Sequence, residues 1–290
     1  MSRFKLAEPL LVLTPAKINL HLYVQHRRPD GYHELALDFV PISLYDQIEF
    51  FDFGSPGLWF LSEPELCPPE QNLVVKAIKA LEREIGEPLD LGVKLTKQVP
   101  NGAGLGGGSA NAAGTLVALN RALGLGISGP RLWEIATALG ADVPFFLDPK
   151  PQQASGIGEI LHPLEGALEW PLLLVKPPVS ISTAQAYQHC QHSARKLPRS
   201  PYDRLVLEAI NPRHNDFFAP LSLLYPELLA LEQALTQAGA AAVQMSGSGS
   251  VMYGLFLEVQ VRDLAKEKLA PLGLGTLYTA EILLSHQYGP

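Results

Sequence analysis

The first clear element of the chain is an alternation of apolar and polar residues that begins near Lys17. Its apolar positions are Ile18, Leu20, Leu22 and Val24. A period of two residues predicts a strand with one buried face. Asp30-Gly31 marks a turn, and strand-like segments continue through Phe53, so we expect the chain to open with a β-rich region.

Residues 54–71 interrupt this pattern with a composition rich in proline, glycine and glutamate. Because these residues are typical of turns and loops, we predict a surface excursion there. Apolar residues then recur at helical spacing over 73–85, and Gly86 and Pro88 indicate where that helix ends.

The next predicted elements are a strand, a glycine-rich loop and a helix. Residues 91–96 alternate as a strand does, and residues 102–108 contain five glycines. Helical spacing resumes after the loop and continues to Gly124. A further helix is predicted between Ser128 and Gly140.

A polar, glycine-rich stretch over 150–158 indicates a change of domain, so we expect domains at residues 1–160 and 161–290. The second domain is predicted to contain strands at 171–176, 240–245, 251–256 and 277–284, a helix at 262–269 and a glycine cluster at 246–250. Helices on one face of an antiparallel sheet fit this order. Residues 188–204 are polar and basic, and we expect them to form a mobile surface stretch.

Composition supports a folded protein and excludes several classes of partner. The chain has 290 residues, of which 47% are hydrophobic, enough for one large or two ordinary domains. The net charge is −7 and the basic residues are scattered, which argues against a nucleic-acid surface. No apolar run reaches the roughly 18 residues of a membrane span and no signal peptide is evident, so we expect a cytoplasmic protein with no membrane partner. Two distant cysteines and eight unclustered histidines favour neither a disulfide framework nor a protein-built metal site.

The glycine run at 102–108 has the composition of an anion cradle. Residues without Cβ can adopt positive φ and approach a ligand closely, and the following helix start offers unpaired N–H groups. The flanking strand and helix argue against a plain flexible linker. A Walker-type loop is disfavoured because no lysine precedes Ser109. Gly102, Gly104 and Gly107 fit the dinucleotide fingerprint, but no acidic residue follows about 20 positions later.

Five motifs in chain order resemble those of the GHMP small-molecule kinases. They are PAKINL (15–20), PDGYHEL (29–35), GLGGGS (104–109), GADVPFF (140–146) and MSGSGS (245–250). Each motif alone could be accidental, but the set covers nearly the whole chain, which makes coincidence a poor explanation. The resemblance is greatest to those members that phosphorylate a cytidine-diphosphate-linked methylerythritol.

This resemblance implies an α+β fold with two domains. The N-terminal domain would be β-rich and bind ATP, and the C-terminal domain would carry a ferredoxin-like antiparallel sheet with helices. The implied reaction moves a phosphoryl group from ATP, carrying Mg²⁺, to a hydroxyl of the cytidylated methylerythritol, giving the 2-phosphate in the non-mevalonate route to isoprenoid precursors. The oligomeric state is left open.

Two residues match the catalytic residues of the family. The resemblance implies that Asp142 accepts the hydroxyl proton and that Lys17 stabilises the emerging alkoxide or the phosphoryl oxygens. A surface lysine and a turn aspartate are the simpler alternatives. The strand that Lys17 opens and the apolar residues that follow Asp142 favour the catalytic interpretation.

The resemblance assigns ATP binding to residues in and before the glycine loop. They are Asn72, Lys97, Pro100, Gly102, Ala103, Gly104, Leu105, Gly106, Gly107, Gly108 and Ser109. Asn72 and Ser109 each have an alternative as the N-cap of a helix.

Acceptor binding is implied for residues that lie far apart in the sequence. They are Asn19, Tyr32, His33, Tyr187, Gly247, Ser248 and Gly249. Aromatic rings can stack on a pyrimidine base and a histidine can bind its edge. The second glycine cluster has a serine at 248 where the family commonly has threonine, and it has a plain β-turn as its alternative.

Two other functions are compatible with the sequence. A related kinase acting on mevalonate, phosphomevalonate or homoserine would share the ATP residues, but its acceptor has no base for Tyr32 and His33 to bind. A non-catalytic nucleotide or metabolite sensor on the same fold would not need both Lys17 and Asp142.

Overall fold

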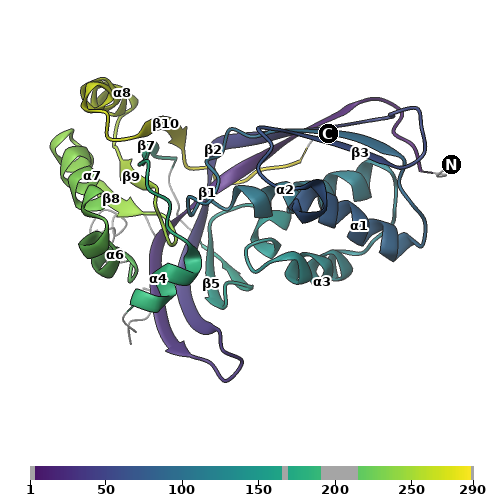
Figure 1. Ribbon diagram of the computed structural model, residues 1–290, viewed down its shortest axis with the longest axis horizontal. Helices are drawn as coiled ribbons and strands as arrows, with labels where there is room; N and C mark the ends of the chain where they lie inside the picture. Colours follow the sequence, from purple (N-terminus) through teal and green to yellow (C-terminus); the bar gives the residue numbers. More distant parts are fainter. Residues whose placement is uncertain (1–3, 165–168, 191–214, 289–290) are drawn as a thin grey trace.

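The computed structural model describes residues 4–164, 169–190 and 215–288, and within these ranges it forms two halves, each a sheet with helices on one side (Figure 1). The strands of the first sheet are β1 (Leu10–Arg27), β2 (His33–Phe51), β3 (Leu58–Glu63), β4 (Leu91–Thr96), β5 (Gln152–Gly156) and β6 (Ile160–Pro163). Their order is β3-β4-β2-β5-β6, with β1 paired to β2. The predicted α+β class is therefore confirmed.

The long hairpin of β1 and β2 forms the middle of the molecule (Figure 1). Helix α2 contacts one side of β1. On the other side, Ile18 and Val40 share a buried cluster with Leu174 and Tyr253 of the second sheet. Because both faces are covered, the centre of β1 is buried throughout and not on one face only, as the alternation alone predicted.

The prediction of a plain surface excursion over residues 54–71 is wrong. Strand β3 lies within it and pairs in parallel with β4, with Leu58 opposite Leu91. The flanking prolines and glycines concealed a short apolar run whose pairing partner lies 33 residues further along the chain.

Three helices cover the first sheet: α1 (Leu73–Ile85), α2 (Gly107–Ala122) and α3 (Gly129–Leu139). Helix α1 ends as predicted, with Gly86 in the left-handed conformation at φ 74°. Helix α2 begins inside the glycine run, and Gly106 at φ 69° is its N-cap. A short 3₁₀ helix, η2 (Pro144–Leu147), follows α3 and brings the chain back toward the sheet.

The second sheet contains β7 (Pro171–Lys176), β8 (Ala242–Met245), β9 (Met252–Leu255) and β10 (Thr276–Glu281), in the antiparallel order β10-β7-β9-β8. This is the ferredoxin-like order, as expected. The helices of this half are α4 (Thr183–His189), α6 (Phe218–Leu224), α7 (Pro226–Gln237) and α8 (Val259–Leu269). Helices α7 and α8 contact the sheet strands.

The chain after β10 returns to the first half (Figure 1). The amide of Leu283 donates to the carbonyl of Pro41 at 2.8 Å, and Nε2 of His286 donates to the carbonyl of Leu13 at 2.8 Å. The division at residue 160 stays a prediction. Strand β6 crosses that division and still pairs with β5.

Most of the polar stretch predicted over 188–204 lies outside the described residues. In the ranges given above, no helix has both the length and the apolar character needed to cross a membrane.

Candidate active site

A cavity of about 870 Å³ lies between the two halves of the molecule. The glycine loop forms one wall, Lys17 and Asp142 lie in it, and Tyr32, His33 and Tyr187 line another part. Of the predicted site residues, all but Asn72 and Gly249 line this cavity. The structure therefore brings together residues from β1, the hairpin turn, the glycine loop, α4 and the second glycine cluster.

The glycine loop is fixed by close packing on its neighbours. The amide of Lys17 donates to the carbonyl of Leu105 at 2.9 Å, which ties β1 to the loop. Gly104 has φ 77°, and a Cβ on it would lie 2.0 Å from the carbonyl oxygen of Ser246. Only glycine fits this position, because both the backbone conformation and the space exclude a side chain.

The loop leads directly into α2, whose first-turn N–H groups have no acceptor within the helix. Gly107, Gly108 and Ser109 occupy that first turn and line the cavity. Because the helix dipole adds partial positive charge there, this end of the cavity suits a phosphate.

The second glycine cluster packs on the first. Ser246 Oγ donates to the carbonyl of Gly104 at 2.9 Å. Asn215 holds the cluster from behind through donation to the carbonyls of Met245 and Gly247, each at 2.8 Å. Gly247 and Ser248 line the cavity, and Gly249 does not. The turn therefore supports the first loop and presents only its leading residues to a ligand.

Lys17 and Asn19 lie on the same face of β1, as the strand alternation predicted. Lys17 Nζ donates to Asn19 Oδ1 at 2.7 Å and lies 3.9 Å from Asp142 Oδ2. It also lies 5.2 Å from the centre of the Phe39 ring. Burial of the ammonium lowers the pKa of Lys17, and the nearby Asp142 carboxylate partly opposes that shift.

Lys97 lines the cavity, but its ammonium is already engaged. It forms a buried ion pair with Asp46 and donates to Asn111 Oδ1 at 3.1 Å. Asp46 also accepts from the amides of Gln98 and Val99, each at 2.8 Å. Asp46 was not predicted from the sequence, since no local pattern marks a residue on β2 as a partner of the loop. The network holds the chain just before the glycine loop.

Asn72 and Ser109 each had an alternative as a helix N-cap, and the structure bears out this alternative for Asn72 only. Asn72 is the N-cap of α1, and its Oδ1 accepts from the amide of Val74 at 3.0 Å. Its neighbour Leu73 lines the cavity instead. Ser109 is the third residue of α2 and not its N-cap, so the capping alternative for Ser109 is wrong.

The opposite part of the cavity is aromatic. The His33 and Tyr187 rings stack at 4.7 Å with planes 12° apart, and Tyr187 meets Phe217 edge-on at 5.0 Å. Burial, with smaller contributions from Asp142 and Cys190, raises the pKa of Tyr187 to about 12. Tyr32 lies at the tip of the hairpin turn and is 60% exposed, so its ring is available to a ligand.

Hydroxyl groups close the cavity between the aromatic rings and the second glycine cluster. Thr183 Oγ1 and Ser248 Oγ lie 3.2 Å apart and form a hydrogen bond. Both residues line the cavity. Thr183 was not singled out from the sequence, although it begins the helix that carries Tyr187.

Asp142 is the one acidic residue on the described cavity wall. Across the described ranges, no group of three histidine, cysteine, aspartate or glutamate residues could hold a metal ion.

The fold and cavity define a class of small-molecule kinases. The family model described as "GHMP kinases N terminal domain" matches residues 72–148, and the one described as "GHMP kinases C terminal" matches residues 204–270. A solved homoserine kinase from Cytophaga hutchinsonii shares the fold, with a TM-score of 0.72, 17% identity, and coverage of 99% of this chain and 97% of that one.

Two proteins with higher sequence identity indicate to which group of GHMP kinases the chain belongs. The 4-diphosphocytidyl-2-C-methyl-D-erythritol kinase of Bacteroides fragilis (strain YCH46) is 40% identical over 262 residues, which cover 85% of this chain and 92% of the relative. A crystal structure of 4-(cytidine 5'-diphospho)-2C-methyl-D-erythritol kinase has a TM-score of 0.82 and 33% identity, and the match covers 94% of this chain and 98% of that chain. The chain belongs to the 4-diphosphocytidyl-2-C-methyl-D-erythritol kinase family.

Proposed function

We propose that this protein transfers a phosphoryl group from ATP to a hydroxyl of 4-diphosphocytidyl-2-C-methyl-D-erythritol and forms the 2-phosphate, in the non-mevalonate route to isoprenoid precursors. The observation that carries the proposal is one cavity with three parts. The cavity is lined by the start of α2, which suits a phosphate, by Lys17 and Asp142, and by the aromatic rings of Tyr32, His33 and Tyr187. The family membership supports the same substrate pair.

In this proposal Asp142 accepts the hydroxyl proton. Its side chain is 36% exposed, and its Oδ2 lies 3.9 Å from the Lys17 ammonium. Lys17 is positioned by Asn19 and would stabilise negative charge that develops on the attacking and transferring oxygens. Together they supply a base and an electrophilic group for phosphoryl transfer.

The predicted ATP site fits a nucleotide that brings its own Mg²⁺. Ser109 and Asp142 both line the cavity, and hydroxyl and carboxylate oxygens are ligands that suit Mg²⁺. When bound, the ion would neutralise charge on the phosphate oxygens. In this proposal the residues of the glycine loop bind ATP, and Lys97 contributes because it holds the loop in place.

The test is a coupled assay of ADP release with purified protein. It compares the cytidylated methylerythritol with mevalonate and homoserine at equal concentration. Turnover with the cytidylated acceptor alone is the expected result. Turnover with mevalonate or homoserine instead would assign the protein to another GHMP kinase activity, and no turnover with any acceptor would favour the sensor alternative.

A further inference from the structure

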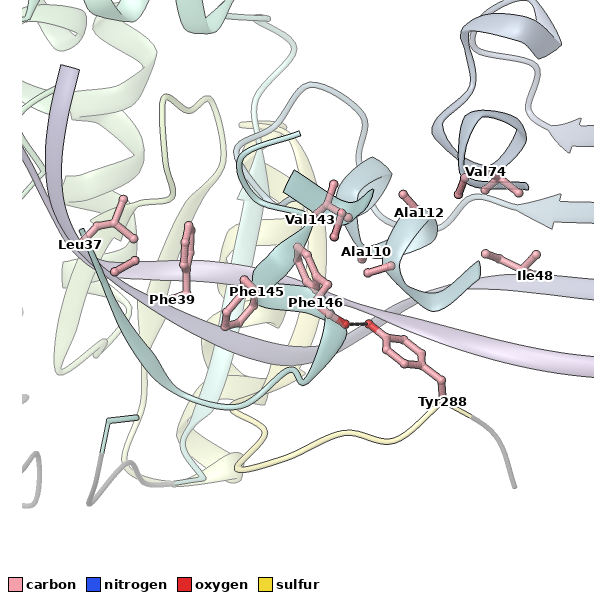
Figure 2. Close-up of a cluster of buried hydrophobic side chains, with 14 of the residues drawn as sticks. Leu37, Phe39, Ile48, Val74, Ala110, Ala112, Val143, Phe145, Phe146 and Tyr288 are labelled. Atoms are coloured by element: carbon pink, nitrogen blue, oxygen red, sulfur yellow. Dashed lines mark hydrogen bonds between the residues drawn. The ribbon is translucent and has the colours of Figure 1, made fainter. Parts of the chain in front are cut away.

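The last described residues of the chain return to the half of the molecule that carries the glycine loop. After β10, residues 282–288 run across β1 and β2 and end against α2 and η2. Tyr288 is 4% exposed, and its hydroxyl donates to the carbonyl of Phe146 at 2.6 Å (Figure 2). Phe146 is in η2, four residues after the proposed base Asp142.

The Tyr288 ring also packs on the helix that begins at the glycine loop. A Cβ on Gly114 of α2 would lie 3.1 Å from a ring carbon of Tyr288, so the absence of a side chain at 114 makes room for the ring. One side chain thus contacts both the phosphate-loop helix and the segment that follows Asp142.

Phe146 transmits this contact to the reacting groups. A Cβ on Gly106 would lie 2.9 Å from the Phe146 ring and 3.1 Å from Lys17 Cγ, so both side chains pack closely against Gly106. A second path leads through Phe145, which meets Phe146 edge-on at 4.8 Å and lies 4.9 Å from Phe39 (Figure 2). Phe39 is the ring beneath the Lys17 ammonium.

We propose, on the basis of the function proposed above, that Tyr288 is a positioning residue for phosphoryl transfer. Its hydrogen bond fixes η2, and through the Phe146 ring it sets the relative placement of Lys17, Gly106 and Asp142. Tyr288 does not line the cavity, so it acts through these residues and not on a substrate. Misplacement of reacting groups by a fraction of an ångström slows a reaction without weakening ground-state binding.

The Tyr288 hydroxyl is a permanent donor over the working pH range. Burial, and secondarily the Asp148 carboxylate, raise the pKa of Tyr288 far above that of a free tyrosine. His286 is a further anchor of the segment, because it donates to the carbonyl of Leu13 and meets the Tyr288 ring edge-on at 5.1 Å.

The test uses Tyr288→Phe, which removes the hydroxyl and keeps the ring, so that the fold is retained. The matched control is Tyr278→Phe in β10, on the second sheet and away from η2. Single-turnover transfer from ATP to the cytidylated methylerythritol is measured together with KM for both substrates and the thermal midpoint. Rates are normalised to the fraction of protein that binds ADP in a calorimetric titration, so partial unfolding cannot imitate a slower transfer.

Tyr288→Phe is expected to lower the transfer rate about tenfold and to keep both KM values within about twofold of wild type. Tyr278→Phe is expected to leave the transfer rate and both KM values unchanged. A lower thermal midpoint with an unchanged transfer rate would overturn the inference, because Tyr288 would then only stabilise the fold. If the wild type is active and both variants transfer the phosphoryl group at the wild-type rate, the role of Tyr288 is overturned and the proposed function still stands. A wild type that transfers no phosphoryl group overturns the proposed function and this inference with it.

Discussion

The Lys17 ammonium lies 3.9 Å from the Asp142 carboxylate, although one side chain is 5% exposed and the other 36%. Lys17 comes from a strand buried on both faces, and Asp142 comes from the segment between α3 and η2. The pair therefore combines a desolvated cation with a carboxylate that a substrate can reach. This asymmetry suits a fixed electrophilic group beside a base that must contact the acceptor hydroxyl.

Replacement of Asp142 tests the assignment of the base. Asp142→Asn keeps the shape of the side chain but cannot accept the proton, so kcat is expected to fall by about 10² to 10⁴. The Kd for ATP, measured by calorimetry, should change little. An unchanged kcat would show that Asp142 is not the proton acceptor.

The buried position of Lys17 predicts a pH dependence. Burial lowers its pKa below the usual value of about 10.4, so the charged form is present below the lowered pKa and is lost as pH rises through it. We expect kcat to fall on the alkaline side at a pH below 10.4. The control is Lys17→Arg, whose guanidinium does not titrate in this range, so its residual activity should lack that decline. A wild-type kcat that stays constant up to about pH 10 contradicts a catalytic ammonium at position 17.

Tyr32 tests the base-binding end of the cavity. Stacking of a base on an aromatic ring contributes about 1–3 kcal/mol, so Tyr32→Ala should raise KM for the cytidylated acceptor by roughly 5- to 150-fold and leave KM for ATP nearly unchanged. The control is Phe53→Ala, which removes an exposed ring that stacks on Trp59 away from the cavity. Equal changes in both KM values would argue against a cytosine platform at Tyr32.

Two glycines of the loop provide a matched comparison of space and strain. Gly102 and Gly104 both have positive φ, but a Cβ on Gly102 meets nothing within 4 Å, whereas one on Gly104 lies 2.0 Å from Ser246 O. Gly102→Ala should lose about 1–2 kcal/mol from backbone strain alone. Gly104→Ala should lose more and raise KM for ATP, because the two glycine clusters must separate. Denaturant unfolding and KM for ATP check both variants, and equal effects would contradict the packing argument.

Local patterns predicted much of the fold and of the site. The strand at 91–96, the loop at 102–108 and the helix after it follow from periodicity and glycine content, and the structure confirms all three. Strand β3 was missed because its flanks have the composition of a loop and its partner, β4, follows an intervening helix.

Contacts between distant segments could not be predicted in this way. Asp46 supports Lys97 from a strand 51 residues earlier, and the Tyr288 hydroxyl meets a carbonyl 142 residues away. Such pairs depend on how the sheets and helices assemble, and no spacing along the chain encodes them. The catalytic and binding roles of the site residues themselves stay predictions.

The most direct test of the central claim is a competition experiment in one vessel. Equal amounts of 4-diphosphocytidyl-2-C-methyl-D-erythritol, mevalonate and homoserine are incubated with ATP, Mg²⁺ and the protein, and the products are identified by mass spectrometry. The account predicts a singly phosphorylated cytidylated product, with the other two acceptors unchanged, and at least about 100-fold less of that product with Asp142→Asn over the same interval. Phosphorylated mevalonate or homoserine as the main product would contradict it.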